Sequence, residues 1–213
     1  MMRKVLSIFV AVGLVVVFSS ALQATVVPLG NESLTDLLGS NYTALGGGVM
    51  ITPMSCSDLE TEVYSRAFTN NAGLYAYLYQ INNNLPASNA FVEMFTLGGF
   101  YGAAANIEMG YLSGDIPSGF LSEGQTSHMA NVNASVGPTL SYYYLDGFDS
   151  SIFAGEHSIV MYAMSNYSPN VITGNVINSA TASGPVIGAV IPEPATLCLL
   201  GLGGLLLRRR KSA

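Results

Sequence analysis

The sequence predicts an all-β fold, a single β-sandwich or jelly-roll-like domain. Residues 74–81 alternate between two side-chain faces, which is the period of a β-strand. Clusters of Gly, Pro, Asn and Asp recur at short intervals, and no stretch keeps a long helical period with capping residues at its ends. Short strands separated by turns favour a sandwich or jelly roll over a fold of alternating strands and helices.

The clearest predicted element is a β-hairpin that pairs residues 63–68 with residues 74–81. Between them, residues 69–73 ("TNNAG") have the composition of a turn. The alternation gives the second strand two different faces. These faces carry Tyr75, Tyr77, Tyr79 and Ile81 on one side and Leu74, Ala76 and Leu78 on the other.

Four further segments are predicted as strands because turn-forming residues bound each of them: 90–96, 131–136, 140–145 and 158–164. Two segments, 35–38 and 57–64, are expected to form short helical turns. Gly46, Gly47 and Gly48 are not followed by the Lys and Ser/Thr of a phosphate-binding loop, so we interpret them as a flexible turn.

The N-terminus has the order of a secretory signal peptide. Arg3 and Lys4 precede an apolar stretch over residues 5–18, and small residues follow it. We expect residues 1–24 to be the signal peptide, with cleavage after Ala24; cleavage after Ala21 is an alternative. A retained N-terminal membrane anchor is the other interpretation of this segment.

The C-terminus combines a short apolar run with a cluster of cations. Residues 195–207 are 13 uncharged residues, which as a helix would reach about 20 Å, whereas a bilayer core is about 30 Å thick. Pro192 and Pro194 interrupt any helix that would extend the run upstream. The run is followed by a basic stop on the cytoplasmic side, Arg208, Arg209, Arg210 and Lys211. We therefore expect a tail that a membrane holds briefly.

Pro192, Glu193 and Pro194, the apolar run, the basic cluster and the chain end occur in the order of the PEP-CTERM sorting signal of bacterial exported proteins, which residues 191–213 closely resemble. This resemblance implies recognition by an exosortase, a membrane-embedded enzyme similar to cysteine proteases, and removal or transfer of the tail. The expected organisation is therefore a signal peptide (1–24), an extracellular β-rich domain (25–190) and a sorting tail (191–213).

The predicted domain is strongly acidic. Residues 25–190 contain twelve of the thirteen acidic residues but one of the seven basic ones, Arg66, which gives a net charge of −11. This charge argues against nucleic acid as a partner and against electrostatic docking on anionic lipid. The domain contains Cys56 as its one cysteine, and Cys198 lies in the tail, so a disulfide within the processed domain is excluded.

Candidates for chemistry are few. His128 and His157 are the only histidines and have no metal-ligand spacing. His157 lies between Glu156 and Ser158, but no nucleophile-elbow motif accompanies it, so we assign no catalytic residue. Cys56 has no neighbouring cation to stabilise a thiolate, and we expect a buried or free thiol.

Two patterns allow a binding role. Asp146 and Asp149 lie in a glycine-containing segment that is either a calcium loop or an ordinary acidic turn, and we favour the turn. Tyr142, Tyr143 and Tyr144 offer rings that stack on sugars, but core packing and cross-strand pairing explain them as well.

The sequence predicts a non-enzymatic structural or interaction protein, exported and displayed at the cell surface or in an exopolysaccharide matrix, with no metal or cofactor. Exosortase is the expected transient partner, and the membrane is contacted only through the termini. A carbohydrate-binding module for extracellular polysaccharide and a secreted hydrolase are the alternatives.

Overall fold

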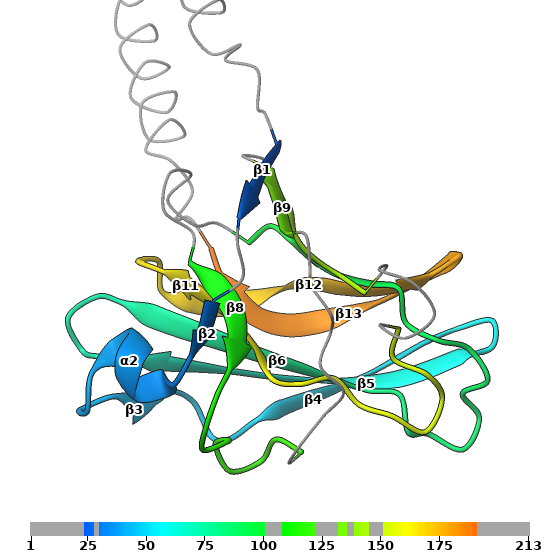
Figure 1. Cartoon of the computed structure of the whole chain (residues 1–213), viewed down its shortest axis with the longest axis horizontal. Helices are drawn as coiled ribbons and strands as arrows, with labels where there is room; N and C mark the ends of the chain where they lie inside the picture. The colour runs from blue at the N-terminus through cyan, green and yellow to red at the C-terminus, as the bar shows by residue number, and fades with distance from the viewer. Residues whose placement is uncertain are drawn as a thin grey trace, which may run out of the picture.

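The computed structural model describes residues 30–100, 108–121, 139–144 and 151–190, together with the backbone of two strands at 24–27 and 132–135. Almost every regular element in these residues is a strand, which confirms the predicted all-β class (Figure 1). The elements are β1 (Ala24–Val27), β2 (Gly30–Glu32), α2 (Leu34–Leu38), β3 (Thr43–Ala44), β4 (Met50–Cys56), β5 (Leu59–Thr69), β6 (Tyr75–Asn82), β7 (Met94–Gly98), β8 (Met109–Leu112), β9 (Val132–Ser135), β10 (Thr139–Tyr143), β11 (Met161–Ser165), β12 (Pro169–Asn178) and β13 (Ala180–Ala189).

Two sheets form the layers of the domain. The larger sheet has the order β2-β8-β11-β6-β5-β3, and β4 also pairs with β5. The smaller sheet has the order β10-β7-β12-β13, and Figure 1 shows β12 and β13 stacked on β4, β5 and β6. Described strand pairs are antiparallel except β2 with β8, which is parallel. The β1–β9 pair forms a separate small ladder.

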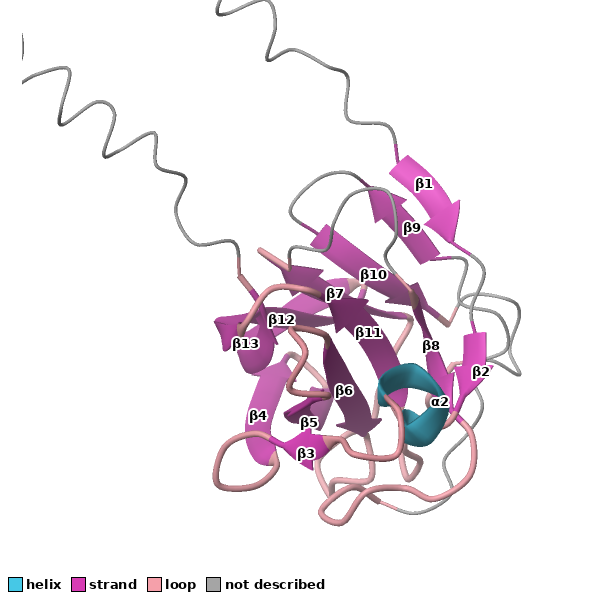
Figure 2. Cartoon of the chain, turned by 90° about the vertical axis from the view of Figure 1, so that its left-hand side faces the viewer, coloured by secondary structure: helices cyan, strands magenta, loops and turns pink. Residues whose placement is uncertain are grey.

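The predicted hairpin is correct. Strands β5 and β6 pair antiparallel, from Glu62 opposite Asn82 to Thr69 opposite Tyr75. Tyr77, Tyr79 and Ile81 enter the core between the sheets. Ala76 and Leu78 enter a second core, which α2 and neighbouring residues cover on the other face of the larger sheet (Figure 2). Strand β6 is therefore buried on both faces, which explains why both of its alternating sets are apolar.

Helix α2 confirms the helical turn expected near residue 35. Ser33 caps it: the Ser33 side chain accepts a hydrogen bond from the Asp36 N–H, and the Asp36 carboxylate accepts one from the Ser33 N–H. This capping hydrogen bonding lowers the pKa of Asp36. The second expected helical turn, residues 57–64, is wrong. Leu59, Thr61 and Val63 alternate onto one buried face, so the segment begins β5.

The other predicted strands occur with shifted ends. Residues 90–96 correspond to β7, which begins at Met94, while Val92 forms an isolated bridge with Ile152. Residues 131–136, 140–145 and 158–164 correspond to β9, β10 and β11.

Strand β4 and the long β12–β13 hairpin were not predicted from the sequence. Glycine interrupts the hairpin's apolar pattern, and the structure gives the reason. A Cβ atom on Gly184 would lie 2.6 Å from Thr52 Cγ2 of β4, and one on Gly174 would lie 2.9 Å from Val186 Cγ1. These strands therefore approach their neighbours more closely than a side chain permits. Val186 and Ala189 are buried in the domain, so this end of β13 belongs to the folded core.

Candidate functional site

Tyrosine hydroxyls connect the two sheets to each other and to the loop between β11 and β12. The hydroxyl of Tyr79 donates to the Ile187 carbonyl oxygen at 2.7 Å, and that of Tyr77 donates to the Tyr167 carbonyl oxygen at 2.5 Å. The hydroxyl of Tyr142 donates to the Tyr162 carbonyl oxygen at 2.7 Å. Burial raises the pKa of Tyr79 and of Tyr142 well above the ordinary value, so both hydroxyls remain protonated donors.

This arrangement decides the role of the three consecutive tyrosines. Tyr142 and Tyr144 are 1% and 0% exposed, and only Tyr143 is half-buried. Two of the three rings that the sequence offered as a sugar platform are therefore core side chains. A run of three tyrosines in a strand fits a core strand and a binding face equally well, so the sequence pattern did not distinguish the two.

The two residues beside His157, Glu156 and Ser158, both accept hydrogen bonds from backbone N–H groups. Ser158 is fully buried, and its Oγ accepts a hydrogen bond from the Ile81 N–H at 2.9 Å. The Glu156 carboxylate accepts one from the Phe153 N–H at 2.9 Å, and His157 itself forms a β-bridge with Asn82. The Glu156 carboxylate therefore holds the backbone of its own loop, and the Ser158 hydroxyl ties this loop to β6. His128 lies outside the described residues.

The remaining candidates give no metal or thiol site in the described part of the chain. Cys56 is a half-buried free thiol at the end of β4. The described residues contain no group of three or more His, Cys, Asp or Glu side chains placed to hold a metal ion. Asp146 and Asp149 lie outside these residues.

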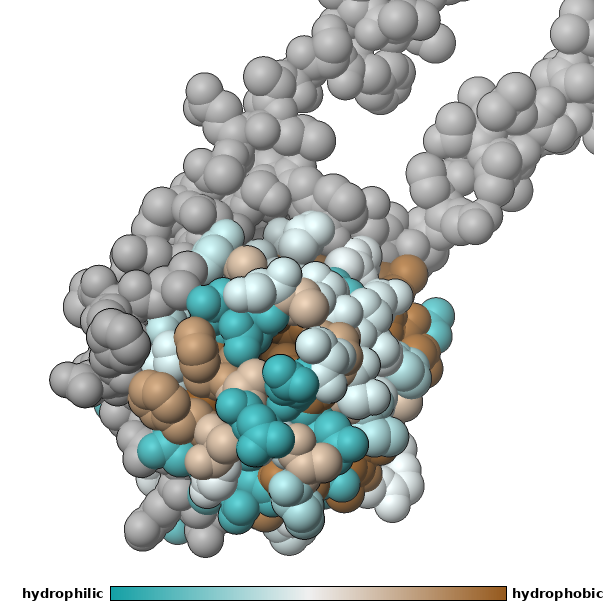
Figure 3. Space-filling model, turned by 90° about the vertical axis from the view of Figure 1, so that its right-hand side faces the viewer, coloured by the Kyte–Doolittle hydropathy of each residue, from teal (hydrophilic) through white to brown (hydrophobic). Residues whose placement is uncertain are grey.

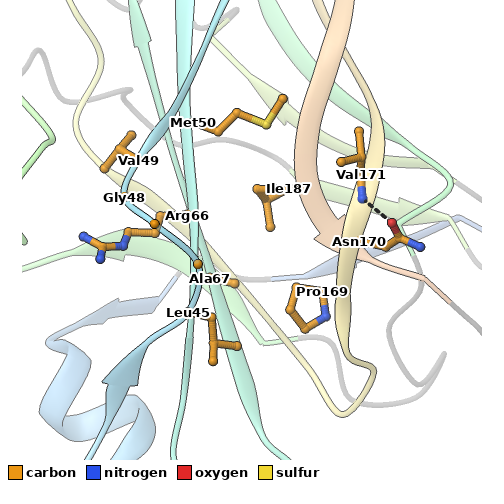
Figure 4. A pocket seen from close by; sticks show the side chains of 12 residues that line it. Leu45, Gly48, Val49, Met50, Arg66, Ala67, Pro169, Asn170, Val171 and Ile187 are labelled. Atoms are coloured by element: carbon orange, nitrogen blue, oxygen red, sulfur yellow. Dashed lines mark hydrogen bonds between the residues drawn. The ribbon is translucent and has the colours of Figure 1, made fainter.

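One groove lies where the two sheets meet. It encloses about 420 Å³ between the residue 45–50 segment and strands β12 and β13. In Figure 4, Val49 and Met50 lie on one side, Pro169 and Val171 on the other, and Ile187 between them. The three glycines predicted as a turn form part of the wall, with Gly46 and Gly48 at positive φ. Sequence reasoning missed this groove because its walls are far apart in the chain.

The chain leaves the folded domain beside this groove. Ala189 is the last residue of β13, is fully buried and pairs with Pro169, which lines the groove. At the other end, Ala24 is the first residue of β1 and lies opposite Ser135 of β9. Cleavage after Ala24 stays a prediction, and the rest of residues 1–24 lies outside the described part.

The surface has no single broad apolar face in the view of Figure 3, where hydrophilic and hydrophobic patches alternate among the described side chains. Within the described residues, the exposed large hydrophobic side chains are Ile51, Phe153 and Val171. Among the described residues, no helix is long and apolar enough to cross a membrane.

Residues 190–211 match the PEP-CTERM protein-sorting motif, which confirms the resemblance of the tail. The motif supports sorting of this protein by an exosortase toward the cell surface. Pro192, Glu193, Pro194 and the basic stop fall inside the matched range, outside the described residues. No curated protein and no solved structure matches the chain.

Proposed function

We propose that this protein, whose chain carries a PEP-CTERM sorting motif, is a non-enzymatic structural or interaction protein of the cell surface or the exopolysaccharide matrix. The observation that carries the proposal is the position of the motif. It begins at residue 190, directly after Ala189, the last paired residue of the domain. An exosortase would therefore separate a complete folded domain from its tail.

The character of the domain supports an extracellular structural role. Its net charge of −11 suits a matrix that divalent cations crosslink. The chemistry-bearing side chains near His157 are engaged in holding the loop at residues 153–158. The buried tyrosines stabilise the sandwich, so polysaccharide binding would have to use other aromatic side chains, such as the half-buried Tyr143 or the exposed Phe153.

Replacing Pro192, Glu193 and Pro194 by alanine should abolish processing, so that the unprocessed chain accumulates in the membrane fraction. The wild-type protein should lose its basic end, because the exosortase removes it. Cell fractionation followed by intact-mass measurement distinguishes the two forms.

The control is Ser212→Ala, which changes the tail outside the matched range and should be processed normally. A wild-type surface or secreted form that still carries residues 208–213 would contradict the proposed sorting.

A further inference from the structure

We infer that the groove beside the tail contacts the lipid bilayer while the tail is held in the membrane. This inference rests on the proposed function, because it requires the tail to enter a membrane before processing. It adds a second contact, made by the folded domain itself, with membrane lipid as the partner.

The shape of the groove follows from the edge of β5. Strand β3 pairs with β5 at Phe68 and Thr69, whereas β4 pairs with the part of β5 from Ser65 back to Leu59. Between these contacts the chain turns away from the edge after the Leu45 N–H donates to the Ala67 carbonyl oxygen at 2.9 Å. Residues 46–48 are glycines, and a Cβ atom on any of them would have no other atom within 4 Å. The groove is thus open on this side.

The side chains that line the groove are mostly aliphatic, apart from Asn170 and Arg66, and none of them is acidic. Val171 is 54% exposed, the highest value among the exposed large hydrophobic residues, and it lies opposite Ile187 on the neighbouring strand. No aspartate or glutamate lines the groove, although the domain carries a net charge of −11. Water-exposed aliphatic side chains and the absence of repelling carboxylates are what contact with a bilayer requires.

Arg66, the one cation of residues 25–190, borders the groove. Its side chain points away from Ile187 in Figure 4, so it lies at the margin. Its Nη1 donates to the Ser118 carbonyl oxygen at 3.5 Å, its Cζ lies 5.4 Å from the Phe68 ring centre, and its Nε is buried without a hydrogen-bond partner. Arg66 therefore borders the groove, and the proposed lipid contact rests on the aliphatic side chains of the lining.

The tail keeps the groove close to the membrane. Ala189 pairs with Pro169 at the groove, and the apolar run begins at Ala195, six residues later. Six extended residues span at most about 20 Å. The groove therefore lies within about 20 Å of the point where the tail enters the bilayer. A second copy of the chain is disfavoured as the occupant, because two domains of charge −11 repel each other.

Site-directed spin labelling of the full chain in phosphatidylcholine vesicles, which carry no net charge, tests this inference. One sample carries Val171→Cys with Cys56→Ser and Cys198→Ser. The matched control carries Phe153→Cys in the same background, because Phe153 is also exposed, at 38%, but its loop lies near the far end of β6. Tyr77 lies toward the groove end of β6 and Asn83 at the end near Phe153, and about 20 Å of strand separates these two residues. A third sample, Cys56→Ser alone, reports on the tail through Cys198.

We expect the ratio of accessibility to oxygen over accessibility to a water-soluble nickel chelate to rise several-fold at 171 when vesicles are added, with no change at 153. Equal water accessibility at 171 and 153, with Cys198 in lipid, overturns the inference and leaves the proposed function standing. Cys198 in water overturns both. Dipolar broadening between labels at 171 on two chains would identify a second copy as the occupant and also overturn the inference.

Discussion

A buried tyrosine hydroxyl stabilises this fold only where it has a hydrogen-bond acceptor. Tyr79 and Tyr162 are both fully buried, but only the hydroxyl of Tyr79 has a hydrogen-bond acceptor, the Ile187 carbonyl oxygen of the opposite sheet. The hydroxyl of Tyr162 has no partner and lies against Gly30, where a Cβ atom would otherwise sit. A buried polar group without a partner loses its hydration and gains nothing in return.

Tyr162→Phe should therefore leave the free energy of unfolding unchanged or raise it by up to about 1 kcal/mol, because it removes an unsatisfied hydroxyl. Tyr79→Phe should lower it by about 1–3 kcal/mol, because a buried carbonyl loses its donor. Urea unfolding followed by far-UV circular dichroism measures both. A larger loss for Tyr162→Phe than for Tyr79→Phe would contradict this assignment of the hydroxyl roles.

Among the elements, the parallel β2–β8 pair depends on two glycines that face each other. Gly30 lies opposite Gly110, and a Cβ atom on Gly110 would collide with the backbone of Gly30. Backbone atoms cannot rotate aside as the end of a side chain can, so β2 would have to move. This edge strand can therefore pair with β8 only because glycine has no Cβ atom.

Gly110→Ala should lower the free energy of unfolding by about 1–3 kcal/mol, because overpacking displaces β2. The Ser113 amide, which donates to the Glu32 carbonyl oxygen of β2, should then exchange its hydrogen faster. Gly98→Ala is the control, since its Cβ would lie 3.6 Å from the Thr173 carbonyl oxygen, an ordinary contact. Equal stability of the two variants would show that β2 does not need the close approach.

For the whole molecule, the distribution of charge is the dominant property. Residues 25–190 combine twelve acids with Arg66 alone, and that arginine lies inside β5, opposite Leu78 of β6. Trypsin cleaves after Lys or Arg in segments that can open locally. The position of Arg66 in a paired strand removes the one cleavable site of the domain from easy access.

Native protein should therefore resist trypsin over residues 25–190, whereas the urea-denatured protein should give two fragments that meet after Arg66. Mass spectrometry of timed digests measures both, and the denatured sample confirms that the bond is cleavable. Rapid cleavage after Arg66 in the native protein would be inconsistent with a stable β5–β6 hairpin.

Features that depend on neighbouring residues in the chain could be predicted from the sequence by itself. The β5–β6 hairpin was predicted because alternation and turn composition are local, and both faces of β6 came out as expected. The sorting tail was predicted for the same reason, since a tripeptide, an apolar run and a basic end need no fold to be recognised. The helical turn expected at 57–64 was wrong, because a few residues fit both a helical and a strand period. Burial against distant residues makes the segment a strand.

Only the tertiary structure decided what depends on contacts between distant segments. The β12–β13 hairpin was missed because its glycines are required by close contacts with Thr52 and Val186, which the neighbouring residues in the sequence do not reveal. Likewise, the tyrosines became core residues because carbonyl oxygens of distant strands lie within reach of their hydroxyls. The groove exists because the residue 45–50 segment meets β12 and β13, more than a hundred residues away. Such contacts are set by packing across the whole domain, which no local pattern encodes.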